Sequence, residues 1–196
     1  MRNIVDDKQG GIIVANRQML LKRHVDGDPV AFSELVEIYR SKVYAYLVRC
    51  GVDERTRDDL FQDIFIKIHK AASTFKSDKP LNPWIFTIVA NTVRAHYRKQ
   101  RVHRLVYQDE VPEKKDHTPD SYDFVEARET ADWLETELQK LPFSQRETLV
   151  LSATGNMDQQ SISKVLDMPL STVKTNLRRA RITLAKAFIR KDGKEL

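Results

Sequence analysis

Apolar residues recur every three or four positions along most of the chain, which is the spacing of one face of an α-helix. In the first half this spacing predicts four helices, over residues 16–25, 29–50, 53–73 and 82–104. In the second half it predicts one helix over residues 127–140 and three more that contain residues 149–151, 162–166 and 173–184. No segment alternates apolar and polar residues as a half-buried strand does. We therefore expect an all-α fold.

Residues that favour helix ends support these limits. Asp28 and Asn82 each precede a proline, the order expected of an N-cap residue followed by a proline in the first turn. Gly51 is expected to end the second helix, because glycine readily adopts the left-handed conformation of a helix C-terminus. Ser144 is followed three positions later by Glu147, which is the spacing of a capping box.

One stretch interrupts the helical pattern and divides the chain. Residues 105–125 show no apolar period, and Pro112 and Pro119 lie there among charged side chains, a composition typical of a linker. We therefore expect an N-terminal tail over residues 1–15, a helical domain over residues 16–104, a flexible acidic linker over residues 105–125 and a second small helical domain over residues 126–196.

The distribution of charge indicates the kind of partner. The chain has 33 lysines and arginines against 28 acidic residues, a net charge of +5. Basic residues gather at 94–104 and 174–194, whereas acidic residues gather at 109–129. Basic clusters on predicted helices favour a partner that carries phosphate, and nucleic acid is the leading candidate.

Other composition features exclude several classes of protein. The single cysteine, Cys50, cannot form an internal disulfide and falls on an apolar helix face, so we expect a packed core thiol. The five histidines have neither the spacing of a metalloprotease motif nor a nucleophile partner, so we expect no catalytic residue, metal ligand or cofactor. No apolar run approaches the length of about 20 residues that spans a bilayer, and no signal peptide is recognisable, so we expect a cytoplasmic protein without membrane insertion.

The last two predicted helices have the pattern of a DNA-reading helix-turn-helix. Asp158 and Ser171 are expected to cap them, and residues 167–169 form the turn between them. With Val173 and Leu177 facing inward, the outward residues are Thr172, Lys174, Thr175, Arg178 and Arg181. Polar side chains early in such a helix suit base edges in the major groove, and later arginines suit phosphates. The alternative is a basic, solvated helix of an ordinary bundle.

Two further surfaces are predicted in the first domain. The third helix carries Asp59, Gln62, Asp63 and Ile66 opposite its apolar stripe, an edge that suits a basic protein surface but is also typical of a solvated helix. The fourth helix carries a ridge of Trp84, Thr87, Asn91, Arg94 and Arg98. Aromatic, amide and guanidinium groups in one line suit single-stranded DNA, through stacking, base contacts and phosphate contacts respectively. Burial of the tryptophan is the alternative for that residue.

Three segments resemble a known family: GDPVAFSELVEIYRSKVYAYL at residues 27–47, DDLFQDIFIKIHKAASTF at 58–75 and NPWIFTIVANTVRAHYRKQR at 82–101. They are similar to region two of bacterial sigma factors, and residues 141–186 are similar to region four. The short linker, with no region three between them, resembles the extracytoplasmic-function (ECF) group of the sigma-70 family.

The resemblance implies a function and a set of site residues. It implies a sigma factor that binds core RNA polymerase and directs promoter-specific initiation and DNA melting, without a catalytic role. The expected contacts with the clamp helices of the largest catalytic subunit are Asp59, Leu60, Phe61, Gln62 and Asp63. The expected contacts with the melted minus ten element are Phe75, Lys76, Ser77, Asp78, Lys79, Trp84, Asn91, Arg94 and Arg98. The expected contacts with the duplex minus thirty-five element are Ser171, Thr172, Lys174, Thr175, Arg178 and Arg181.

Some positions depart from the family pattern, and one rival function stays open. Ser171 and Asn176 stand where the family usually has glycine and arginine, and we expect both to affect which promoters are chosen. Anti-sigma partners are common in the family. The alternative is a stand-alone helix-turn-helix regulator that binds duplex DNA without core polymerase, but this alternative accounts only for the second domain.

Overall fold

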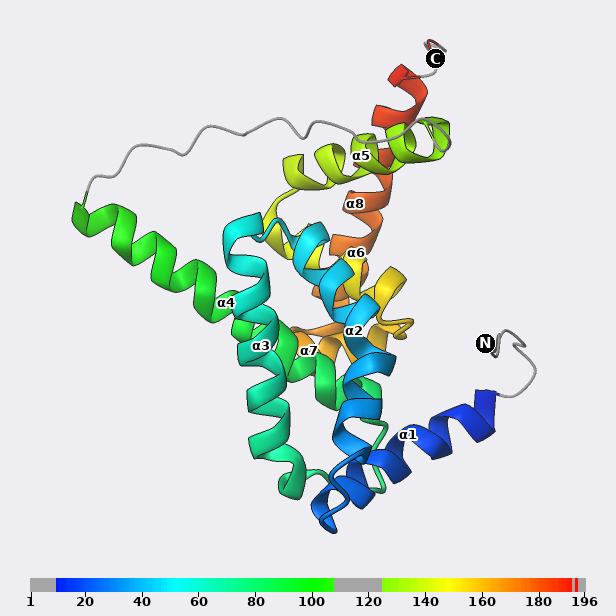
Figure 1. Cartoon of the computed structure of the whole chain (residues 1–196). Coiled ribbons are helices and arrows are strands. Elements are labelled where there is room, and N and C mark those ends of the chain that lie inside the picture. The colour runs from blue at the N-terminus through cyan, green and yellow to red at the C-terminus, as the bar shows by residue number, and fades with distance from the viewer. Residues whose placement is uncertain (1–9, 108–124, 192, 194–196) are drawn as a thin grey trace.

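The computed structural model describes residues 10–107, 125–191 and 193, and the side chains of residues 17–102, 130–191 and 193. Within these residues the fold is entirely helical, as predicted, with eight α-helices and no strand. The helices are α1 (Gly10–Val25), α2 (Ala31–Cys50), α3 (Glu54–Ala71), α4 (Leu81–Tyr107), α5 (Val125–Lys140), α6 (Phe143–Thr154), α7 (Gln159–Leu166) and α8 (Leu170–Lys191), with a short 3-10 turn at Ala72–Thr74 (Figure 1).

The first domain packs α1, α3 and α4 around the long apolar stripe of α2. Tyr39, Tyr46 and Leu47 on that stripe are fully buried, and Ile64 of α3 and Phe86 of α4 pack against them. Burial of large apolar side chains is the main stabilising contribution to such a core. The predicted stripe of α2 is therefore confirmed. Cys50 is also fully buried, and burial raises the pKa of its thiol to about 12, which confirms the predicted core thiol.

The second domain packs α6, α7 and the first half of α8 together. Ile162 and Leu166 of α7 and Val173 and Leu177 of α8 are buried as predicted. A sharp turn joins the two helices, with Asp167 in the left-handed conformation at φ 50°. The helix-turn-helix geometry is thus confirmed. On α5 and directly after it, the three- and four-residue spacing of Ala131, Leu134, Leu138 and Leu141 predicts one buried face, but only Leu138 and Leu141 are buried, whereas Ala131 and Leu134 are exposed.

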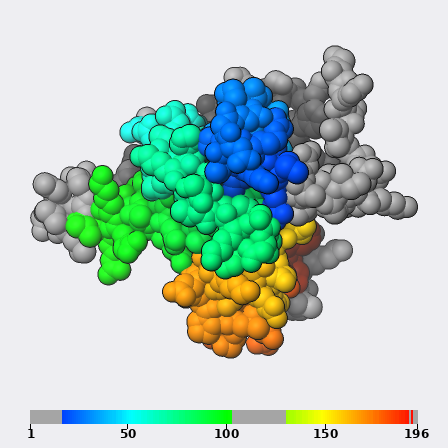
Figure 2. Space-filling model, turned by 90° about the horizontal axis from the view of Figure 1, so that it is seen from below, coloured from blue at the N-terminus to red at the C-terminus, as the bar shows by residue number. Residues whose placement is uncertain are grey.

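The two domains lie directly against each other. α2 contacts α5 and α6, and α4 contacts α7, so that one continuous apolar cluster includes residues of both domains. Figure 2 shows the second domain, in orange, against the green residues of the first. Gly51, at φ 87°, allows a close approach, because a Cβ atom there would lie 2.1 Å from Oε1 of Gln139 in α5.

Some helix ends differ from the predictions. Asp28 and Asp158 accept backbone hydrogen bonds as N-terminal caps do, the first from Val30 and Ala31 and the second from Ser161. Asn82, however, lies inside α4, and its Oδ1 accepts a hydrogen bond from the Tyr39 hydroxyl. Its predicted capping role is therefore wrong, because a buried phenol holds the amide instead.

Ser144 and Ser171 were predicted to cap the N-termini of helices, and neither does so. No side chain caps α6, which begins after Pro142, so the capping box of Ser144 and Glu147 is wrong. Glu147 is instead drawn into the contact between the domains. α8 begins at Leu170, which places Ser171 within the first turn rather than at the cap.

Three helices extend past the segment limits expected from the sequence. α1 begins at Gly10, inside the predicted N-terminal tail. α4 continues to Tyr107, and α5 begins at Val125, so both reach into the linker predicted over residues 105–125. The rest of that linker lies outside the described residues.

Candidate nucleic-acid and polymerase interfaces

The outward face of α8 does not pack against the core of the second domain. Ser171, Thr172, Lys174, Thr175, Arg178 and Arg181 are all exposed, while Val173, Leu177 and Ala180 on the opposite face are buried. The Thr175 hydroxyl donates to the Ser171 carbonyl at 2.9 Å. Among the described residues, no ion pair occupies Lys174, Arg178 or Arg181, so three cationic groups are available to an anion outside the chain.

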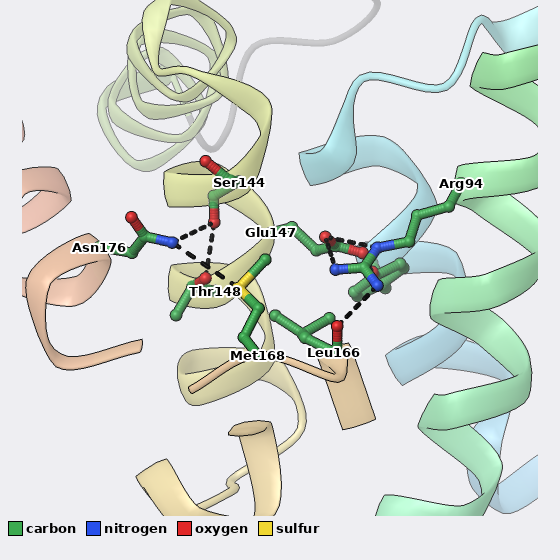
Figure 3. A network of polar contacts seen from close by, with 8 residues as sticks. Arg94, Ser144, Glu147, Thr148, Leu166, Met168 and Asn176 are labelled. Carbon is green, nitrogen blue, oxygen red and sulfur yellow. Dashed lines mark hydrogen bonds and ion pairs between the residues drawn. The ribbon is translucent and has the colours of Figure 1, made fainter. Parts of the chain in front are cut away.

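Asn176, which was expected to affect promoter choice, lies on the inner face of the same helix. Its side chain is 7 % exposed. The amide nitrogen donates to the Ser144 carbonyl at 3.5 Å and lies 3.9 Å from the Met168 sulfur (Figure 3). The departure from the family pattern at this position therefore concerns packing of α8 on α6. Ser171, in contrast, lies on the exposed face.

The predicted polymerase-binding edge of α3 combines exposed polar groups with a half-buried apolar base. Asp59 and Gln62 are exposed, and Leu60 and Phe61 pack against the core of the first domain. Ile66, one turn further on, is 50 % exposed. The edge thus has a carboxylate, an amide and an aliphatic side chain in contact with solvent.

Asp63 differs from its neighbours on this edge. It is half-buried, and its carboxylate pairs with Lys67 Nζ at 2.7 Å. The same ammonium lies 3.3 Å from the Thr92 hydroxyl of α4. Lys67 therefore joins the predicted polymerase edge to the next helix.

The predicted minus ten surface begins in the loop between α3 and α4. Lys76, Ser77, Asp78 and Lys79 are exposed there. Phe75 is half-buried, and its ring lies 5.3 Å from that of Trp84, at an interplanar angle of 60°. Each of these two aromatic side chains thus has one ring neighbour within the protein. Neither the buried alternative for Trp84 nor a fully open stacking platform describes it, because the indole is only half covered.

The ridge of α4 is divided by the second domain. Asn91 and Arg98 are exposed, as the spacing predicts, but Arg94 points into the contact between the domains. Its Nε and Nη2 donate to Oε2 of Glu147 at 3.0 and 2.9 Å, and its Nη1 donates to the Leu166 carbonyl at 2.9 Å (Figure 3).

Glu147 is the centre of that contact, a position that the sequence analysis did not predict. Its side chain is fully buried, and its second oxygen accepts a hydrogen bond from the Tyr46 hydroxyl at 2.9 Å. Burial raises the pKa of the Glu147 carboxyl, while the Arg94 guanidinium acts in the opposite direction. A usable signal existed in the sequence, because Val150 and Leu151 follow Glu147 by three and four positions and place it on the apolar face of its helix.

Comparison with known proteins places both halves of the chain in one family. The model of Sigma-70 region 2 matches residues 35–102, and that of Sigma-70 region 4 matches residues 131–184. The RNA polymerase sigma-H factor of Pseudomonas aeruginosa is 27% identical over 187 residues, which cover 87% of this chain and 93% of that protein. The ECF RNA polymerase sigma factor SigW of Bacillus subtilis is 26% identical over 190 residues, with coverages of 86% and 97%.

Solved structures show the same arrangement of helices. CnrH, in a complex with the cytosolic domain of CnrY, is 25% identical and matches with a TM-score of 0.66, covering 88% of this chain and 97% of that one. The sigma factor RpoE of Bartonella quintana, in a complex with the anti-sigma factor NepR, matches with a TM-score of 0.69 at 20% identity, covering 80% of this chain and 96% of that one. The second match concerns the fold alone.

The all-helical fold, the exposed face of the helix-turn-helix and the two family matches define the class: the chain belongs to the sigma-70 family of RNA polymerase sigma factors. Within that family it is a member of the ECF group. As a sigma factor it binds core RNA polymerase and directs promoter-specific transcription initiation. The stand-alone regulator is not favoured, because the first domain also matches a sigma-factor region. In the part of the chain that the structure describes, no helix is long and apolar enough to cross a membrane.

Proposed function

We propose that this sigma factor divides promoter recognition between its two domains. The exposed face of α8 binds the duplex minus thirty-five element, with Ser171, Thr172, Lys174 and Thr175 near base edges and Arg178 and Arg181 near phosphates. The observation that supports this assignment best is that the two faces of α8 differ. One face packs on α6, and the other carries lysine and arginine side chains that form no ion pair with any described residue. A recognition helix presents such a face to the major groove.

The first domain, in this proposal, captures the melted minus ten strand. The loop of residues 75–79 and the exposed part of the α4 ridge, Trp84, Asn91 and Arg98, contact unstacked bases and the backbone, and Arg94 joins them when it is free. Bases unpaired from the duplex are recognised by stacking and by their exposed edges. Because this surface binds only the melted strand, binding shifts the DNA equilibrium toward the open state. The polymerase carries out the chemistry, and we expect no catalytic activity from the sigma factor itself.

Contact with the polymerase is assigned to the α3 edge. Asp59, Leu60, Phe61, Gln62 and Asp63 bind the clamp helices of the largest catalytic subunit. The exposed carboxylate and amide beside Ile66 support this assignment, because such an edge fits a basic surface with an apolar centre. In this proposal the sigma factor acts in the bacterial cytoplasm. An anti-sigma partner is also proposed, since a sigma factor of similar fold was solved in a complex with an anti-sigma factor.

Transcription reconstituted from purified parts tests the proposal. Promoters are first found by mapping transcription starts after overexpression, and each is then transcribed by core polymerase with and without the sigma factor. We expect Asp59→Arg to abolish both polymerase pull-down and transcription, because it reverses a charge at the centre of the edge. Glu37→Arg, on an exposed part of α2, serves as the matched control and should retain both. Full activity of Asp59→Arg would remove α3 from the polymerase interface.

A further inference from the structure

Arg94 belongs to two surfaces at once. By its position on α4 it continues the proposed minus ten ridge of Asn91 and Arg98, but its side chain contacts only the second domain in the network described above. The edge formed by Nε and Nη2 is the edge with which arginine binds an oxyanion in two parallel hydrogen bonds. In this structure the carboxylate of Glu147 occupies that edge.

We propose that Arg94 exchanges between Glu147 and a phosphate of the melted promoter strand, so that docking of the second domain on α4 and binding of the minus ten strand exclude each other. Carboxylate and phosphate bind the same edge of a guanidinium, so one replaces the other without a change in the arginine. The inference rests on the proposed function of the α4 ridge, and it assigns Glu147 as the group that keeps Arg94 of this ridge from binding DNA.

The burial of Glu147 explains why the exchange must separate the domains. The Glu147 side chain is 1% exposed and the Arg94 side chain 26%. If Arg94 moves to a phosphate, Glu147 loses its cationic partner, and an unpaired carboxylate in an apolar contact is strongly unfavourable. The carboxylate can then regain hydration only when α6 leaves α2 and α7 leaves α4. Binding of Arg94 to DNA thus favours separation of the two domains.

Besides the shared apolar cluster, in which the ring centroids of Tyr97 and Phe143 lie 5.1 Å apart, polar contacts join the domains. Arg49 Nη1 donates to the Thr154 hydroxyl at 2.7 Å, and Gln139 Nε2 lies 3.4 Å from the Arg49 carbonyl. These are hydrogen bonds at partly exposed positions, each of modest net stability. A buried ion pair likewise gains little over two separately hydrated ions, although it is costly to break on one side only. A ligand that binds only the separated state can therefore shift the equilibrium.

A spin-label distance measurement on the full-length chain tests the docked state directly. Lys70→Cys on α3 and Lys164→Cys on α7 place labels on exposed positions of the two domains, outside the proposed binding surfaces. Cys50 is replaced with alanine in every labelled protein, because it lies beside Glu147 and separation of the domains would expose it to the label. We expect a single narrow distance distribution for the parent protein. A single-stranded oligonucleotide with the minus ten sequence of a mapped promoter should convert it to a broad one.

Charge reversal at Glu147 provides the decisive variant. Glu147→Lys should give the broad distribution without DNA and should bind the oligonucleotide about tenfold more tightly, because the competing docked state is lost. Glu37→Lys adds the same charge on α2, where Glu37 pairs with Arg40 within the first domain, and should behave as the parent protein. Arg94→Gln should also give the broad distribution but should bind the oligonucleotide more weakly than the parent, because the phosphate ligand is lost.

Folding of each variant is checked by circular dichroism, and Arg49→Ala gives a second route to opening that leaves Glu147 intact. A narrow distribution for folded Glu147→Lys and Arg49→Ala would overturn the inference. So would a parent protein that binds the oligonucleotide and stays docked. Glu147→Lys could open the domains while no variant binds the oligonucleotide or supports transcription with core polymerase. In that case the proposed function fails and the exchange fails with it. The ion pair then remains only the contact that holds the domains together.

Discussion

α4 and α8 are both long helices with a basic outward ridge, yet only one of the ridges is free. On α8 every predicted DNA contact is exposed, and the inner face packs on α6. On α4 the ridge is interrupted at Arg94, which pairs with a buried carboxylate of the other domain. Helical spacing states which way a side chain points from its own helix, whereas its availability to a ligand depends on what else packs there.

The largest expected effect comes from comparing a substitution on the buried face of α8 with one on its exposed face. Val173→Asp places a carboxylate in the fully buried core of the helix-turn-helix, where no partner is available to it, and should reduce the free energy of unfolding by about 4 kcal/mol. Thr172→Asp, one residue earlier on the exposed face, should change that free energy by less than about 0.5 kcal/mol. Denaturant unfolding followed by circular dichroism measures both. Equal losses would mean that the face of α8 assigned to DNA is also part of the core.

The next effect compares two arginines of the α4 ridge. Arg94→Ala removes the cation that pairs with Glu147 and should reduce the unfolding free energy by at most about 3 kcal/mol, because separation of the domains limits the loss to the free energy of their contact. Arg98→Ala, one turn further on at an exposed position, should cost less than about 0.5 kcal/mol. The comparison is measured by urea denaturation of the two variants beside the parent protein. If both arginines prove equally dispensable, the ion pair contributes nothing to the docked arrangement.

Variants on the free ridge of α8 should lose DNA affinity without losing stability. Replacing Lys174 or Arg178 with alanine should weaken binding by about 1–3 kcal/mol if the side chain reads a base, and only for promoters that carry that base. If it holds a phosphate, all sequences should weaken alike and the slope of log K against log salt should fall by about 1. Fluorescence anisotropy with duplex DNA over a range of salt concentrations separates these cases. Unchanged binding by both variants would remove α8 from the DNA interface.

The smallest effect at neutral pH concerns the core that lies beneath the contact of the two domains. The pKa of the Cys50 thiol is about 12 in the folded protein, above its ordinary value, because burial disfavours the thiolate. The unfolded chain therefore loses this proton at a lower pH than the folded chain does. Between about pH 9 and pH 12 the contribution of Cys50 to stability should fall by at most about 1.4 kcal/mol per pH unit, and below that window it is constant.

Substitution of Cys50 isolates this effect from other titrations. Cys50→Ser has no group that ionises in this range, so the difference in unfolding free energy between the two proteins should change between pH 8 and about pH 10. A thiol reagent should also label the native protein only as fast as the domains separate or the first domain opens. Rapid labelling of folded protein at neutral pH would show that Cys50 is accessible.

The sequence predicts the helices and their buried faces well, because apolar periodicity records burial directly. The stripe of α2 and the turn between α7 and α8 have the predicted structure. The polar residues were predicted less well, since several local roles compete for one side chain. Asn82, Ser144 and Glu147 each have a residue type and spacing that favour a helix cap, but tertiary contacts decide their partners. Asn176 lies inward for a similar reason, because its amide finds a carbonyl of α6.

The surfaces assigned to the polymerase and to DNA follow from periodicity together with the resemblance to sigma factors. Periodicity places Asp59 and Gln62 outward, and both are exposed. It gives no information about the distance between one domain and the other. A contact such as that of Tyr46 with Glu147, which lie 101 positions apart, cannot be recognised from local pattern.

The chain between α4 and α5 also limits how far the domains can separate. Eighteen peptide units join Tyr107 to Val125, so covalent geometry restricts their separation to roughly 65 Å even at full extension. A tether of this length keeps each domain at an effective concentration of about a millimolar around the other. The docked arrangement therefore needs only a weak intrinsic affinity to be populated, and cutting the tether should separate the domains in dilute solution.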